Sequence, residues 1–181
     1  MDKSSYLKTI SLPQKPVATT APPDTVCVDA DMQFHLGLKF AGSDGRAPDY
    51  AQAAEWYRKA AEQNHSLAQF NLGMMYADGR GVARDAVQSR MWYAKAAQQG
   101  EAGAQFNLGN SCHHTSFRQV PADAAESRIE AYKWYRLAAA QGYQGSEMAH
   151  AILTLNMTPA DVAAGKRRVA AFKKERPQSG G

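Results

Sequence analysis

The stretch from His65 to Gly100, HSLAQFNLGMMYADGRGVARDAVQSRMWYAKAAQQG, decides the fold of this chain. Two short motifs lie within it, QFNLG at Gln69–Gly73 and WYAKAA at Trp92–Ala97. Between them, the sequence DGRGV at Asp78–Val82 contains two glycines and is typical of a turn. The stretch therefore predicts two helices that are joined by a glycine-rich turn.

The first of these helices has a regular apolar face. Ala68, Leu72 and Tyr76 are four residues apart, so they lie on the same side of a helix. Gly73 stands beside them in mid-helix, where glycine costs about 1 kcal/mol relative to alanine. We interpret this glycine as a position that another backbone approaches closely. Asp85 is expected to be the N-cap of the second helix, because its carboxylate can accept hydrogen bonds from free amides of the first turn.

Both motifs recur along the chain in phase. The first returns as QFHLG at Gln33–Gly37 and as QFNLG at Gln105–Gly109, 36 residues before and after the middle copy. The second returns as WYRKAA at Trp56–Ala61, 36 residues before, and as WYRLAA at Trp134–Ala139, 42 residues after. The third unit thus has six additional residues between its two motifs. Repetition with this period is the signature of stacked helical units.

The repeat predicts an all-α protein, an α-solenoid of about three and a half helix–turn–helix repeats with a C-terminal capping helix. A single helical pair cannot bury its apolar face alone, so the pairs must stack, and the stack must be capped. Thr158 and Pro159 suit the start of the capping helix. The predicted pairs are 29–41 with 49–63, 66–77 with 85–99, and 102–113 with 122–141, followed by helices over 144–155 and from 158 onward.

On these residues the chain resembles the Sel-one-like repeat family of the bacterial type, a relative of the tetratricopeptide repeat. The resemblance covers residues 29–157, and Met157–Pro159 is similar to the ending of many bacterial members. The middle unit matches the family pattern at Ala68, Leu72, Gly73, Tyr76, Gly79, Gly81, Val82, Asp85, Trp92, Tyr93, Lys95, Ala96, Ala97 and Gly100. The third unit departs from it, because it has no Gly-x-Gly turn after its first motif. The cysteine-rich secreted branch of the family is not matched, since only Cys27 and Cys112 are present.

Four regions follow from the repeat. They are a disordered N-terminal tail over 1–28, the Sel-one-like solenoid over 29–157, the capping helix over 158–176 and a disordered end over 177–181. The tail has no apolar core of a signal peptide, and the chain has no run of about 18 apolar residues that could span a membrane. We therefore expect a cytoplasmic protein without stable membrane insertion.

The net charge of +4 does not point to nucleic acid. Residues 158–181 hold six basic and two acidic side chains, so the rest of the chain sums to zero. A short basic run is usually a solvated helix face, and this one has no interleaved aromatic residues on which bases could stack. A nucleic-acid partner is not expected.

The residues most suggestive of catalysis are Cys112, His113 and His114. Adjacent histidines on a helix point about 100° apart and rarely bind one metal ion, and no Cys or His has the spacing of a zinc site. A Cys–His nucleophile would also need an oxyanion hole, which no motif indicates. We predict no catalytic residue, metal or cofactor, so that the protein is not an enzyme. The alternative, an enzyme centred on Cys112 and His113, predicts that Cys112→Ala abolishes an activity.

A second apolar stripe indicates where a partner would bind. Phe70, Met74 and Ala77 lie about 200° around the helix from Ala68. The family resemblance implies that such positions line the concave face, which suits an extended or helical peptide. The residues predicted to bind the partner on the concave face are Phe34, Leu38, Phe70, Met74, Phe106, Asn110 and His113. The alternative for the phenylalanines is burial by the adjacent repeat.

These observations favour a non-catalytic scaffold or adaptor that binds a segment of a partner protein on its concave face. The alternative is an inhibitor or immunity-type regulatory protein that blocks one enzyme or receptor. Both would bind protein, and they differ in the identity of the partner and in affinity.

Overall fold

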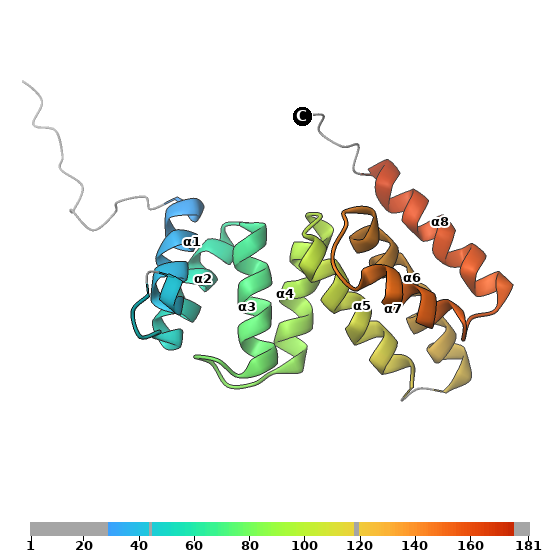
Figure 1. Ribbon diagram of the computed structural model, residues 1–181, viewed down its shortest axis with the longest axis horizontal. Coiled ribbons are helices and arrows are strands. Elements are labelled where there is room, and N and C mark those ends of the chain that lie inside the picture. The colour runs from blue at the N-terminus through green and yellow to red at the C-terminus, as the bar shows by residue number, and fades with distance from the viewer. Residues whose placement is uncertain (1–28, 44, 118–119, 176–181) are drawn as a thin grey trace, which may run out of the picture.

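The computed structural model describes residues 29–43, 45–117 and 120–175, and the regular elements of these residues are all helical (Figure 1). The elements are α1 (Ala30–Leu38), the π-helical turn η1 (Lys39–Ser43), α2 (Tyr50–Glu62), α3 (Ser66–Asp78), α4 (Ala86–Gln98), α5 (Ala102–Ser116), α6 (Pro121–Ala140), α7 (Ser146–Thr154) and α8 (Pro159–Glu175). The predicted all-α class is confirmed. The predicted disordered segments 1–28 and 177–181 lie outside the described residues, as does the last residue of the predicted capping helix.

The helices stack in chain order. Three pairs form the first three units, α1 with α2, α3 with α4, and α5 with α6. Successive units meet because α2 packs against α3, α4 against α5, and α6 against α7. The chain then reverses, and α8 packs against α6 (Figure 1). The result is the predicted solenoid, with α7 as the first half of a fourth unit.

Polar side chains and left-handed residues set the helix ends. The carboxylate of Asp85 accepts hydrogen bonds from the amides of Val87 and Gln88 at 2.8 and 3.0 Å, so the predicted N-cap is confirmed. Thr158 and Asp161 cap α8 reciprocally, each side chain accepting from the other residue's amide at 3.2 Å. The second helices end in left-handed residues, and this conformation lets the following amides donate hydrogen bonds to the last carbonyl groups of the helix. These residues are Asn64, Gly100 and Gly142, with φ of 67°, 97° and 73°.

The six additional residues of the third unit lengthen its helices. The second unit turns through Gly79 and Gly81, both with positive φ, and its helices have 13 residues each. The third unit has no such glycines, and its helices have 15 and 20 residues. The first helix therefore continues to Ser116, beyond the predicted end at 113. Within the described residues, no helix is both long and apolar enough to cross a membrane.

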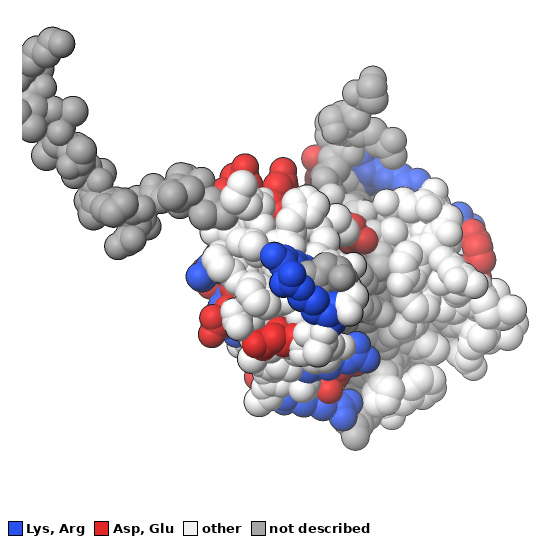
Figure 2. All heavy atoms as spheres, turned by 60° about the vertical axis from the view of Figure 1, so that its left-hand side comes forward, with Lys and Arg blue, Asp and Glu red and all other residues white. Residues whose placement is uncertain are grey.

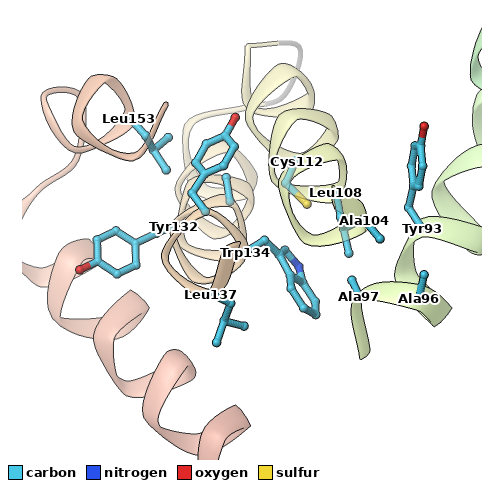
Figure 3. Packing of buried hydrophobic residues seen from close by; sticks show 12 residues of the cluster. Tyr93, Ala96, Ala97, Ala104, Leu108, Cys112, Tyr132, Trp134, Leu137 and Leu153 are labelled. Atoms are coloured by element: carbon cyan, nitrogen blue, oxygen red, sulfur yellow. The ribbon is translucent and has the colours of Figure 1, made fainter. Parts of the chain in front are cut away.

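The core combines aromatic rings with alanines. Figure 3 shows Trp134 of α6 on the side of Leu108 in α5 and of Ala97 near the end of α4, whereas the Tyr132 ring of α6 points to the opposite side, toward α8. The alanines keep side-chain volume low where units meet, so that the helices approach closely and the rings fill the remaining space. Two such clusters continue through the stack, one centred on α2 and α3 and one on α5 and α6.

The motif glycines lie under tyrosine rings. A Cβ atom added at Gly73 would lie 2.8 Å from two ring carbons of Tyr93 in α4. In the third unit, a Cβ at Gly109 would lie 2.7 Å from two ring carbons of Tyr135. The expectation that a backbone packs at this glycine is therefore wrong. The close neighbour is a flat aromatic ring of the second helix, which lies against the bare backbone of the first.

A buried glutamine connects each unit to the one before it. Gln69 in α3 is 0% exposed, and its Nε2 donates to the carbonyl oxygen of Ala61 at 3.0 Å, at the end of α2. Its Oε1 accepts from Gln99 at 2.7 Å. Gln105 repeats the arrangement in the third unit, donating to Ala97 at 3.2 Å. Each buried amide thus satisfies a helix-end carbonyl of the preceding unit and anchors its own unit.

Candidate partner-binding site

The first helices of the units are nearly free of charge. Within α3 and α5, the only Asp, Glu, Lys or Arg is Asp78, at the end of α3. Figure 2 shows acidic and basic side chains gathered over the N-terminal units, and a broad, largely uncharged surface beside them. A surface formed by such uncharged helices can offer a partner apolar contacts and amide hydrogen bonds, but few salt bridges.

The predicted phenylalanines lie between units. Phe34 stacks on His65 of the second unit, with ring centroids 4.5 Å apart. Phe70 packs against Tyr93 at 5.9 Å and reaches Gly103 of the third unit, and Phe106 contacts Tyr143 at 5.3 Å. All three phenylalanines are half-buried. Each ring therefore fills the junction to the following unit and leaves part of its surface accessible.

The other predicted contact residues differ in exposure. Met74 is 37% exposed, and Leu38 is half-buried against the first core cluster. Asn110 is exposed, and its Oδ1 accepts a hydrogen bond from the Tyr135 hydroxyl at 2.8 Å. His113 is half-buried beside Phe117, with ring centroids 5.1 Å apart. Burial lowers the pKa of His113, and the charges of Arg128 and His114 add to this effect.

The sequence analysis did not predict the part of the stripe that the fourth first-helix, α7, contributes. Met148, Ile152 and Leu155 stand 42 residues after Phe106, Asn110 and His113, so they continue the same stripe on α7. They are 67%, 49% and 84% exposed, which makes this the most accessible apolar part of the stripe. The sequence GSEMAHAI at 145–152 retains almost none of the QFNLG motif, so only the helical spacing could have revealed it. We define the inner stripe as Phe34, Leu38, Ala41, Phe70, Met74, Ala77, Phe106, Asn110, His113, Met148, Ile152 and Leu155.

The structure separates the residues that looked most catalytic. Cys112 belongs to the buried cluster of α5 and α6 (Figure 3), whereas the His113 ring packs against Phe117. Burial raises the pKa of the Cys112 thiol. Among the residues that the structure describes, no group of three or more His, Cys, Asp or Glu side chains could hold a metal ion. Cys112 therefore lies in the environment of a packing residue, and its neighbour does not face it.

We expect Cys112 to be unreactive in the folded protein. Only the thiolate attacks alkylating reagents, and burial disfavours both the thiolate and the approach of the reagent. In a Cys27→Ser background, iodoacetamide should label Cys112 at least about 100-fold more slowly in buffer than in denaturing urea. The measurement is the labelled fraction over time by mass spectrometry. Similar rates in the two conditions would show that the thiol is accessible and would revive the enzyme hypothesis.

Two of three comparisons place the chain among known proteins. A family model described as the Sel1 repeat matches residues 30–65, 66–101 and 102–143. The solved structure of c5321, a protective antigen present in uropathogenic Escherichia coli strains with an SLR fold, is similar at a TM-score of 0.67 and 26% identity. That match covers 81% of this chain and 30% of c5321, so the chain spans less than a third of that protein. A comparison with curated proteins gave no match.

A second solved structure agrees with the first. The Sel1 repeat protein from Oxalobacter formigenes is 35% identical and has a TM-score of 0.58, over 68% of this chain and 89% of that one. The three matched units begin within one residue of α1, α3 and α5 and end just after the paired second helices. Because these matches cover more than half of the residues, the chain belongs to the Sel1 repeat family, whose members generally mediate protein–protein interactions.

Proposed function

We propose that the protein is a non-catalytic scaffold or adaptor that binds a segment of a partner protein along the inner stripe. The observation that supports this proposal most is the exposed apolar part of the stripe, which includes Met74, Ile152 and Leu155 on nearly uncharged helices. Apolar side chains exposed together commonly mark protein-binding surfaces. Solenoids of this family are also typically non-catalytic scaffolds.

The spacing of the stripe favours an extended or helical segment as the ligand. Its members come from α1, α3, α5 and α7, with Ala41 in η1 and Leu155 at the C-cap of α7, so a partner that contacts all four helices must run across the stack. Half-buried Phe34, Phe70 and Phe106 supply rigid ring edges at the junctions, and Asn110 supplies an amide. This combination of apolar contacts with a few polar groups is typical of a groove that takes a peptide.

The test is affinity capture from native lysate with charged substitutions in the stripe. A Met74→Glu, Ile152→Glu, Leu155→Glu variant should retain its helical circular dichroism, because the three side chains are exposed. Binding of each co-purified protein should fall at least tenfold, or about 1.4 kcal/mol, since a charge would be desolvated in the complex. The control is Val87→Glu, which introduces one glutamate on α4 at a residue that is 77% exposed and outside the stripe, and its effect is compared with that of each single stripe substitution.

The outcomes separate three interpretations. Proteins lost with the stripe variant and retained with Val87→Glu support the proposal. Proteins retained by all variants contradict the inner stripe as the binding site. Where the proposal is supported, the measured Kd for the partner distinguishes an adaptor from a blocking inhibitor. An adaptor typically binds its partner in the μM range, whereas a blocking inhibitor binds at about 1 nM or tighter.

A further inference from the structure

A pocket with both polar and apolar walls opens at the junction between the second and third units. Its walls include Arg84, Ser89, Arg90 and Tyr93 from the α4 region, with Ser111 from α5. The pocket has a volume of ≈ 150 Å³. This is the volume of about five water molecules, at about 30 Å³ each. The space is therefore large enough for a small polar group and too small for a peptide segment.

Comparison of the repeats shows that the pocket replaces an apolar contact. The polar residues Ser89, Arg90 and Ser111 each have an equivalent 36 residues earlier, at the junction between the first and second units. These equivalents are Ala53, Ala54 and Met75. All three belong to one buried apolar cluster. The same place in the fold is thus packed at one junction, whereas at the next it has two hydroxyl groups, a guanidinium group and open space.

The two arginines of the pocket have no acidic partner among the described residues. Arg84 forms no hydrogen bond or ion pair there, and Arg90 has only a contact of 3.9 Å between Nη2 and the sulfur of Cys112. The nearby carboxylates are already engaged. Asp78 pairs with Arg80 at 3.4 Å, and Asp85 caps α4. The pocket therefore presents an excess of hydrogen-bond donors and positive charge.

From this arrangement, the geometry points to a binding site for the carboxylate of a Glu or Asp side chain. Guanidinium groups match carboxylates with paired N–H donors, and the Ser111 hydroxyl can donate to a remaining lone pair. Ala77 belongs both to the pocket wall and to the inner stripe, so the pocket adjoins the proposed groove. That the carboxylate comes from a bound partner segment rests on the proposed function.

The position of the pocket favours a side chain over a chain terminus. It lies between the second and third of the four helices that form the inner stripe. A segment that follows the stripe from Leu38 to Ile152 would pass the pocket in mid-course. Its acidic side chain would enter the pocket while apolar residues on either side contact the stripe. The site would thereby select partner segments with an acidic residue between apolar ones.

The test uses blocked amino acids and needs no partner. The side-chain Nε–Hε signals of Arg84 and Arg90 are followed by NMR while N-acetylglutamate amide is added. We expect saturable shifts of these two signals, and none with the neutral isostere N-acetylglutamine amide. Arg90→Gln should weaken the response at least tenfold. Arg167→Gln, which removes the same charge from an exposed position on α8, should leave it unchanged.

A second variant guards against loss of folding. Ser89→Ala with Arg90→Ala and Ser111→Met restores the three apolar residues of the first junction, so it should fold at least as stably as wild type and show no response. The proposal is overturned if glutamate and glutamine amides act equally, if Arg90→Gln responds like wild type, or if inorganic phosphate saturates the site and the glutamate amide does not. Because the titration needs no partner, its failure leaves the capture experiment on the inner stripe unaffected.

Discussion

Gln69→Leu is expected to lower the free energy of unfolding by about 2–3 kcal/mol, although leucine is the more hydrophobic residue. Gln69 is fully buried and makes hydrogen bonds to Ala61, Asn64 and Gln99, which link α2, α3 and α4. Leucine of similar size would end all three bonds and leave the amide group of Gln99 without its partner. Urea unfolding followed by circular dichroism measures the change.

The matched control is Gln33→Leu. Gln33 has the same place in the first unit and accepts from Gln63 at 2.8 Å, but no described unit precedes it. Its replacement should therefore cost less than about 1 kcal/mol. Equal losses for the two variants would mean that the hydrogen bond within a unit, and not the link between units, supplies the stability.

The second large effect concerns a residue that helix propensity alone would replace. Gly73→Ala should lower the free energy of unfolding by about 1–3 kcal/mol, because the new methyl group would overlap the Tyr93 ring. Propensity alone predicts a gain of about 1 kcal/mol from the same change. The sign of the measured change in a urea titration therefore decides between the two effects.

A double-mutant cycle identifies the ring as the cause. In a Tyr93→Leu background, the flat ring is absent, so the cost of Gly73→Ala should fall by at least about 0.5 kcal/mol. An unchanged cost would indicate that the methyl group meets something other than this side chain. The pKa of the Tyr93 hydroxyl is an independent check on the position of the ring, because burial in this position raises that pKa to about 12.

The fold was predictable because the signals that specify it are local and repeated. The motifs Gln69–Gly73 and Trp92–Ala97, together with Asp85 and the left-handed Gly100, gave the helix pairs and most of their ends. The longer helices of the third unit were not predictable, because inserted residues can extend a helix or form a loop. The neighbour of Gly73 was also misidentified, since a glycine indicates close approach without naming the group that approaches.

The candidate site was predictable only in part, because burial depends on the next unit. Phe34, Phe70 and Phe106 share one register on their helices, but only the structure shows that each ring fills a junction. The exposed side chains Met148 and Ile152 escaped notice because α7 lacks the motif. The pocket at Arg90 and Ser111 required knowing which residues of different units meet, which a single sequence does not state.

The packing of α6 has a consequence for the order in which the molecule opens. This helix packs against α5, α7 and α8, whereas α1 packs chiefly against α2 and η1. When each unit contacts only its neighbours, local unfolding is easiest in the helix that has the fewest neighbouring helices. Backbone amides of α6 should therefore exchange with solvent last, and those of α1 among the first. A ligand that spans the stack would slow exchange most in the N-terminal unit, far from the best-protected helix.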